Sequence, residues 1–335
     1  MPVAKRFAQC LAQRLAQCLA LTLLLVAATV QSGFAQEWPP KSVRLVVPFG
    51  PGSTPDIVGR LIVDGLTKKY PNTTFVVDNK PGASGNLGTD AVAKAPPDGA
   101  TIGISIGGPL AINTLLFSKL PYDPQKDIAP VTQLITQPSA LAVSLDLKVN
   151  SVAELVTLLQ ANPGKYNFSS IGNGSLSHLA MEALALKAGA KLVHVPYTSS
   201  PQAITAIMRN DAQMGCLPAI AVTPQASAGS VKILAVSTAK RSPFLPDVPT
   251  LMESGIDVDA DAWMGLIAPG GTPKPVIDRI NQDVVAIIKE PAVREKLATQ
   301  LMEPVGNSPE AFRARIDGEI ARWAPVIKAS DVKVN

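Results

Sequence analysis

The chain has 335 residues, enough for two domains of ordinary size, and carries 30 basic and 26 acidic side chains. Its formal charge falls from +4 to +1 without the first 35 residues, which hold three of the basic and none of the acidic residues. Such a balance argues against nucleic acid as a partner. Cys216 is then the single cysteine, which excludes an intramolecular disulfide and, with only two separated histidines, a dedicated zinc site. We expect Cys216 to be a small buried hydrophobe.

The first 35 residues have the pattern of a secretory signal peptide. Three basic residues are followed by the apolar run 18–30, and Gly33 and Ala35 put small residues where a signal peptidase requires them. The run is short for a membrane span, and no other apolar run of that kind follows it. We therefore expect export with cleavage near Ala35, and an uncleaved anchor is the alternative.

The segment 43–66, VRLVVPFGPGSTPDIVGRLIVDGL, predicts a strand, a loop with two glycines and an amphipathic helix. Thr54 can cap the helix with its hydroxyl, Pro55 fits the first helical position, and Asp56 suits the positive end of the helix dipole. Free backbone N–H groups at such a helix start can bind an anion. This segment is therefore the first candidate for a binding site.

Apolar strand-like runs alternate with helix-like segments along the chain, which predicts an α/β fold with largely parallel sheets. Ser151 and Glu154 predict a capping box at one helix start. The expected strands are 43–48, 74–78, 101–106, 141–144, 166–169, 192–195, 212–217, 232–237 and 264–268. The expected helices are 55–69, 86–95, 109–116, 152–161, 177–188, 201–209, 218–226, 273–289, 292–299 and 309–328.

Two stretches that are rich in proline and polar residues, 122–137 and 240–258, are expected to be crossings between two lobes. Such crossings place residues 138–249 in one lobe, and residues 36–137 with 250–335 in the other. In a bilobed α/β protein the ligand lies between the lobes, at the carboxyl ends of strands. A single wide α/β domain with long loops is the alternative.

Five loops between a predicted strand and a predicted helix share small and hydroxyl-bearing residues. Glycine lets backbone N–H groups approach a ligand closely, and Ser and Thr add hydroxyl donors. We expect at least three of these loops to line one cleft. Phe49, Tyr197 and Trp263 lie near them, either as pocket walls or as core packing. The loops are 49–54, 81–85, 105–108, 169–175 and 196–200.

No nucleotide-binding or catalytic motif is complete. The first loop lacks the Walker lysine, and its pattern G-x-G-x-x-P breaks the dinucleotide fingerprint at the third glycine. The segment 82–86 lacks the last glycine of a nucleophile elbow. His178 lies near Ser175 and Ser177 without an evident carboxylate, so we expect it to bond loop backbone or to point into the cleft. His194, within a strand, is expected to be structural.

Several motifs together resemble the Bug/TctC-type substrate-binding proteins of tripartite tricarboxylate transporters. They are VRLVVPFGPGSTPDIVGR, VVDNKPGASGNLGTDAVAKAPPDG, NTLLFSKLPYDPQKDIAPVT, HVPYTSSPQA and WMGLIAPGGTPKPVIDRIN, and they follow in this order along the whole mature chain. The resemblance implies a type II periplasmic binding protein of the Venus-flytrap kind. Such a protein is α/β and bilobed, with two mixed or parallel sheets flanked by helices and two hinge crossings.

The resemblance implies capture of a small carboxylated solute, such as a di- or tricarboxylate, an amino acid or a related organic acid, for delivery to membrane transporter subunits. It implies no catalysis, cofactor or metal, and we expect a monomer in the periplasm. A periplasmic sensor that signals to a membrane receptor is the alternative. A serine hydrolase that uses Ser84 or Ser175 is the alternative from another class.

Relatives hold solutes through loop backbone groups, hydroxyls and waters, and Ser53 here stands where they commonly have a second glycine. Asp56 would repel an anion unless it turns sideways as a capping group, which we favour over an ammonium or hydroxyl partner on the solute. Carried onto this chain, the solute contacts fall on Phe49, Gly50, Pro51, Gly52, Ser53, Thr54 and Asp56, on Ser84, Gly85 and Gly107 beside them, and on Ser170, Gly172, Ser175, His178, Tyr197 and Ser199.

Overall fold

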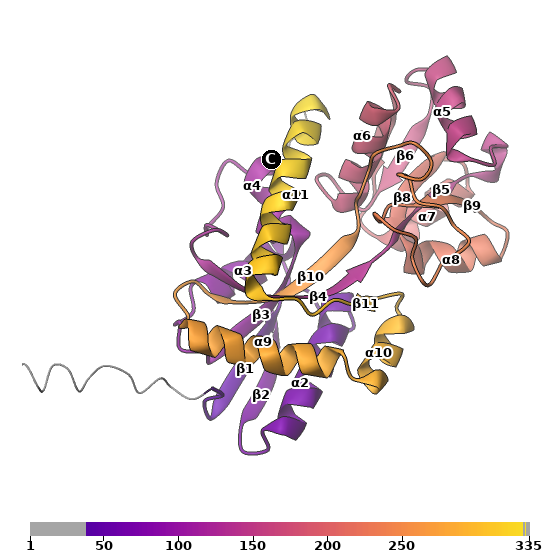
Figure 1. The fold of residues 1–335 in the computed structure, drawn as a ribbon. Helices are drawn as coiled ribbons and strands as arrows, with labels where there is room; N and C mark the ends of the chain where they lie inside the picture. The colour runs from indigo at the N-terminus through magenta and orange to yellow at the C-terminus, as the bar shows by residue number, and fades with distance from the viewer. Residues whose placement is uncertain (1–37, 331, 333–335) are drawn as a thin grey trace, which may run out of the picture. The chain divides into compact units, whose positions relative to one another are not determined.

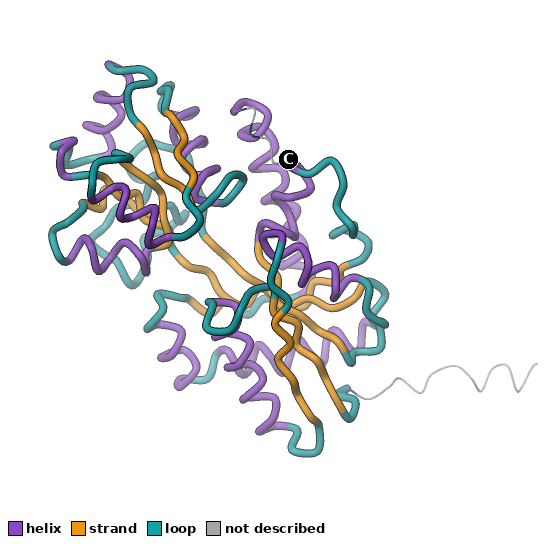
Figure 2. Tube along the Cα trace, turned by 180° about the vertical axis from the view of Figure 1, so that it is seen from behind, coloured by secondary structure: helices purple, strands orange, loops and turns teal. Residues whose placement is uncertain are grey.

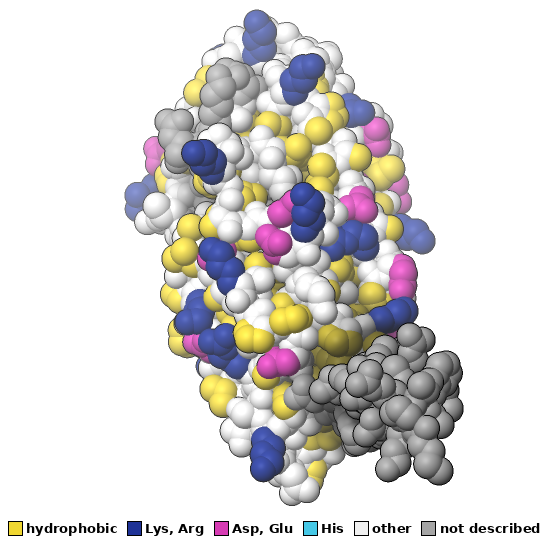
Figure 3. All heavy atoms as spheres, turned by 90° about the vertical axis from the view of Figure 1, so that its left-hand side faces the viewer, with side chains coloured by type: hydrophobic (Ala, Val, Ile, Leu, Met, Phe, Trp, Pro, Cys, Tyr) yellow, Lys and Arg dark blue, Asp and Glu magenta, His cyan; other side chains and the backbone are white. Residues whose placement is uncertain are grey.

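The computed structural model describes residues 38–330 and residue 332. The predicted signal peptide, 1–35, lies outside these residues. Among the helices that are described, none combines the length and the apolar character that a membrane crossing requires. On the face drawn in Figure 3, basic and acidic side chains lie interspersed among apolar and uncharged ones.

Six strands form the first sheet, in the order β11-β4-β10-β3-β1-β2 (Figure 1). β1, β2 and β3 run parallel, whereas β10 is antiparallel to both β3 and β4. The bounds are β1 Ser42–Val47, β2 Thr74–Asn79, β3 Thr101–Ile106, β4 Ile128–Gln137, β10 Ala262–Pro269 and β11 Glu303–Pro304.

The first sheet buries both faces, because successive side chains of its strands point to opposite sides. Leu45 packs in the cluster that contains residues of α2 and α9, and Val46 packs in the cluster that contains residues of α3 and α11. This explains why β1 reads as a continuous apolar run. The helices are α2 Thr54–Lys69, α3 Asn86–Ala93, α4 Asn113–Leu116, α9 Lys274–Ile288, α10 Pro291–Ala298 and α11 Pro309–Ser330, with a π-helical turn Gly108–Ile112 before α4.

Five strands form the second sheet, in the order β7-β6-β8-β5-β9, with helices on both faces (Figure 2). Leu141 packs with residues of α5 and α6, and the next residue, Ala142, packs with residues of α7 and α8. The bounds are β5 Ser139–Val143, β6 Asn167–Ser170, β7 Val193–Pro196, β8 Met214–Pro218, β9 Lys232–Val236, α5 Val152–Ala161, α6 Leu176–Lys187, α7 Ser200–Met208 and α8 Ala219–Ser227.

The predicted burial of Cys216 is confirmed, since this β8 residue is 1% exposed. Burial raises the pKa of its thiol to about 12, so the sulfur stays protonated and unreactive. The capping box is half confirmed. Ser151 Oγ accepts a hydrogen bond from the Glu154 N–H, but the Glu154 carboxylate accepts from Asn150 N–H instead of Ser151 N–H.

The stretch 122–137, expected to be a crossing between lobes, contains a strand that is absent from the expected strands, because its larger part is the ten-residue β4. Its polar residues have partners that the sequence did not reveal. Thr132 Oγ1 donates to the Asn307 carbonyl over 2.8 Å, and Gln133 N–H donates to Asn307 Oδ1 over 2.8 Å. Pro138 alone separates β4 from β5, so the chain passes from one sheet to the other within one residue. The proposed lobe limits stay a prediction.

Helix α11 contributes to hydrophobic clusters of both sheets (Figure 1, yellow). Its first half brings Phe312 and Ile316 to the cluster that contains Val46. Its second half brings Trp323 and Val326 to the cluster that contains β5, β8 and α6 residues. One helix therefore supports both halves of the molecule.

Candidate functional site

The first loop, residues 48–53, joins β1 to α2 and is held by the buried carboxylate of Asp56. Asp56 accepts hydrogen bonds from Gly52 N–H at 2.8 Å, from Asn79 Nδ2 at 2.9 Å, and from two nitrogens of Arg60 at 2.9 and 3.0 Å. The Arg60 hydrogen bond is the main reason why the pKa of this carboxyl falls to about 2. Asp56 is 2% exposed, so it has turned sideways into the protein.

The helix start differs from the expected one at a single position. Ser53, not Thr54, occupies the N-cap of α2, and its side chain makes no capping hydrogen bond. The Ser53 hydroxyl oxygen is buried and has no hydrogen-bond partner in the described part of the chain. The first loop therefore ends in a polar atom that folding leaves unsatisfied.

One further glycine turn, at Gly85, lies against the first loop, and it also meets Pro109 of the turn that begins at Gly107. A methyl group placed on Gly85 would come within 3.4 Å of the Phe49 ring and 3.2 Å of Pro109. One placed on Gly107 would come within 3.1 Å of Trp263. The backbone turns and aromatic rings of the first sheet thus meet closely, as a binding surface built on small residues requires.

Ser84 is exposed in the short turn before α3, with a positive φ of 54°. Asn79 was missed by the sequence reasoning, although it anchors both the Phe49 carbonyl, at 2.8 Å, and Asp56. An asparagine at a strand end gives no signal by itself, because its partners come from other segments.

The second loop, residues 171–175, joins β6 to α6 and uses most of its own backbone donors. Ile171 N–H donates to Ser177 Oγ at 3.0 Å, and Gly172 N–H donates to Ser170 Oγ at 3.1 Å. Ser175 caps α6 by accepting from His178 N–H, and its hydroxyl donates to the Gly172 carbonyl at 2.7 Å. The loop is therefore held by its own hydrogen bonds, and fewer of its N–H groups are free to bind a ligand than its composition suggests.

The turn 197–199, between β7 and α7, lies next to the second loop, because Tyr197 N–H donates to the Ser170 carbonyl at 2.9 Å. Tyr197 is partly exposed, and Ser199 caps α7 by accepting from Gln202 N–H. The structure thus assembles the predicted residues into two groups. The first is Phe49–Asp56 with Ser84, Gly85 and Gly107, and the second is Ser170, Gly172, Ser175, His178, Tyr197 and Ser199.

His178 bonds loop backbone, as expected: its Nδ1 accepts from Gly174 N–H at 3.1 Å. His194 is not only a strand residue, because its Nε2 lies 2.6 Å from Ser170 Oγ. Burial lowers the pKa of His194 to about 4, so this imidazole is neutral at pH 7. Both histidines therefore hold the second loop through hydrogen bonds, His178 to Gly174 and His194 to Ser170.

The hydrolase alternative finds little support in this geometry. Ser175 Oγ donates to a backbone carbonyl rather than to an imidazole. The Ser–His contact that does exist, between Ser170 and His194, involves a serine that is fully buried. Within residues 38–330, no group of acidic, histidine or cysteine side chains is arranged to hold a metal ion.

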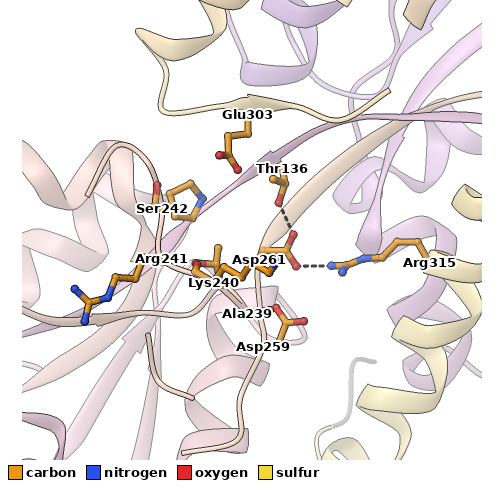
Figure 4. Close-up of a pocket in the computed structure, with 11 residues that line it drawn as sticks. Thr136, Ala239, Lys240, Arg241, Ser242, Asp259, Asp261, Glu303 and Arg315 are labelled. Carbon is orange, nitrogen blue, oxygen red and sulfur yellow. Dashed lines mark hydrogen bonds and ion pairs between the residues drawn. The ribbon is translucent and has the colours of Figure 1, made fainter. Parts of the chain in front are cut away.

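A cavity of about 230 Å³ lies at the crossing between the two sheets, away from the residues predicted to bind solute. Asp261 at its centre accepts hydrogen bonds from Thr136 of β4 and from Arg315 of α11 (Figure 4). Arg315 also pairs with Glu319 at 3.2 Å. No sequence pattern predicts this cluster, since its members come from distant segments. The cavity is lined by Thr136, Pro138, Thr238, Ala239, Lys240, Arg241, Ser242, Asp259, Asp261, Glu303 and Arg315.

Comparison with known proteins gives consistent matches. The family model described as tripartite tricarboxylate transporter family receptor matches residues 58–332. Protein BugT of Bordetella pertussis is 32% identical over 90% of this chain and 92% of its own length. An R. palustris structure with adipate is 34% identical, with a TM-score of 0.76, and covers 89% of this chain and 99% of that one. MatC from Rhodopseudomonas palustris with bound malate is 29% identical, with a TM-score of 0.71, over 87% of this chain and 100% of its own.

Proposed function

Because the chain belongs to the tripartite tricarboxylate transporter family receptors, we propose that it captures a small organic carboxylate, in the first instance a dicarboxylate, for delivery to membrane transporter subunits. It is a periplasmic solute-binding protein of the TctC/Bug type, and its relatives are binding proteins rather than enzymes. The observation that carries the proposal is that two relatives, matched over nearly their whole length, were solved with adipate and with malate.

The geometry supports a carboxylate held mainly by neutral donors between the two groups of residues. Asp56 and Arg60 neutralise one another, so the first loop presents backbone and hydroxyl groups rather than a free charge. The exposed Ser84 adds a hydroxyl from the first group of residues, and the partly exposed Tyr197 adds one from the second. Donors that are fixed in advance bind an anion without the entropic cost of ordering a long basic side chain.

Calorimetric titration of the mature protein with adipate, malate, citrate and glutamate tests the proposal. At least one of these acids is expected to bind with a Kd of about 1 μM or tighter, and saturation at about 100 Kd is expected to stabilise the protein by about 2.7 kcal/mol in thermal unfolding. Neutral sugars of similar size serve as the control. Binding of sugars without binding of any carboxylate would contradict the proposal.

Ser53→Gly is expected to change the ratio of the adipate and malate affinities by about fivefold, because one hydrogen bond is worth about 1 kcal/mol and the Ser53 hydroxyl is unpartnered until a solute arrives. The fold is expected to be unchanged, since Ser53 has an extended backbone that any residue adopts. Ser53→Ala is the matched control, because it removes the hydroxyl without adding backbone freedom. Equal ratios in all three proteins would show that Ser53 does not touch the solute.

A further inference from the structure

The rings of the chain's only two histidines stack face to face and bond to the second loop and to Ser170 just before it. The ring centroids of His178 and His194 are 3.7 Å apart, and the ring planes differ by 12°. The buried Phe168 ring packs against both, with centroid distances of 4.9 Å to His194 and 5.9 Å to His178. Two imidazoles in such contact cannot both carry a positive charge without strong repulsion.

Each ring holds one part of the second loop. His178 Nδ1 accepts the Gly174 N–H at 3.1 Å, so in this hydrogen-bond network the ring proton sits on Nε2, which faces Glu182 at 3.4 Å. His194 Nε2 meets Ser170 Oγ at 2.6 Å, and the same hydroxyl oxygen accepts from Gly172 N–H. The loop conformation therefore depends on nitrogen atoms whose hydrogen-bonding role changes with pH.

Among the described residues, Glu182 is the charged side chain that faces the two imidazoles. Helix α6 also carries Lys187, but this side chain pairs with Asp257. Strand β6 and helix α7 contain no titratable residue, and β8 contributes the buried, protonated Cys216. Helix α11 meets this cluster with Trp323, Val326 and Ile327.

We propose that His178 and His194 are positioning residues that hold the second loop in its solute-binding conformation only while both rings are neutral, so that solute capture weakens in mild acid. A proton on His178 Nδ1 would turn an acceptor into a donor that faces the Gly174 N–H donor. A charge on either ring would also oppose protonation of the other across 3.7 Å. This inference rests on the proposed function, since it concerns the loop assigned to the solute.

The affinity test compares wild-type protein and His178→Asn with adipate and malate as probes, at about pH 7.5 and about pH 5.5. Asparagine places an oxygen acceptor where Nδ1 lies, but it does not take up a proton in this range. Wild-type affinity is expected to fall about tenfold more than that of the variant between the two pH values. Protonation of the probe itself affects both proteins equally and cancels in this comparison.

Two further variants sharpen the comparison. His194→Gln keeps a partner for Ser170 Oγ and removes the second ring; because His194, with a pKa of about 4, stays neutral over this range, the variant is expected to keep the acid effect that His178 causes. Lys187→Gln, on the same helix α6, removes a charge away from the pair and is expected to keep the wild-type acid effect. An equal acid loss in wild type and His178→Asn would overturn the proposal.

A measurement on the solute-free protein separates this inference from the proposed function. The amide NMR signal of Gly174 is expected to shift between about pH 7.5 and about pH 5.5 in the wild type and to stay in place in His178→Asn. A wild-type Gly174 signal that does not move would overturn the histidine proposal. Failure of every carboxylate to bind at about pH 7.5 would instead overturn the proposed function and leave the NMR result to decide the role of the pair.

Discussion

Asp56→Ala is expected to remove measurable capture of adipate or malate and to lower the free energy of unfolding by about 2–3 kcal/mol. The substitution leaves Gly52 N–H and Asn79 Nδ2 without their acceptor, and it releases the exposed Arg60 from the first loop. Because the first loop then loses its fixed shape, the effect on affinity should exceed that on stability. Titration calorimetry and urea unfolding measure the two quantities.

Two variants test whether Asp56 acts as a support. Asp56→Asn keeps the shape and one acceptor but not the charge, so it is expected to fall between wild type and alanine. Asp64→Asn removes an exposed carboxylate from the same helix and is expected to change stability by less than about 0.5 kcal/mol. Full solute affinity in Asp56→Ala would contradict the role given to this residue.

The stabilising contribution of Asp56 is also expected to depend on pH. Its pKa is about 2 in the folded protein and 3.8 in the unfolded reference, so the unfolded chain binds the proton more readily. The contribution, about 2 kcal/mol, is therefore complete above about pH 4 and is lost as the pH falls to about 2. Asp56→Asn should lack this part of the acid dependence.

Arg315→Met is expected to lower the free energy of unfolding by about 3 kcal/mol, because it leaves the buried Asp261 carboxylate without its cation and leaves Glu319 with Arg322 alone. Asp261 is 8% exposed and Glu319 is 2% exposed, and both bond to Arg315 at the crossing between the sheets. Burial already raises the pKa of Glu319 in the wild type. Chemical unfolding of wild type and variant at several pH values measures the loss.

The sign of the pH effect distinguishes this mechanism from simple loss of packing. Burial already raises the pKa of Glu319, and loss of Arg315 should raise it further above its unfolded value, so stability falls as the pH rises through that range. The deficit of Arg315→Met should then be smaller near pH ~5 than near pH ~8. A deficit that does not vary with pH would contradict it. Arg294→Met, an exposed arginine on α10, is the matched control.

Patterns that depend on local sequence were predicted well, and those that depend on distant partners were not. β1, β3 and α2 follow from apolar periodicity and from the turn residues at their ends. β4 is absent from the expected strands because its polar positions find partners far away in sequence: Thr132 Oγ1 and the Gln133 N–H both donate to Asn307, about 175 residues further along the chain. A polar strand whose partners lie so far away looks like a loop in sequence.

The candidate site shows the same division. The glycine and hydroxyl composition of the loops was readable, and so was the bond from His178 to loop backbone. The contact between His178 and His194 was not, because it depends on β6 and β7 pairing so that His194 lies beside Phe168. The bracing of the first loop by Asn79 depends in the same way on β1 and β2 pairing in one register.

The placement of α11 has a consequence for the order in which the protein folds. The hydrophobic cluster of the second sheet includes Trp323, Val326 and Ile327 as well as residues from β5 onward, so it is complete only when the last helix has docked. Contacts between such distant residues carry a large loop-closure cost and form late. Both halves of the molecule therefore share their last packing step, since the same helix supplies Phe312 and Ile316 to the cluster that contains Val46.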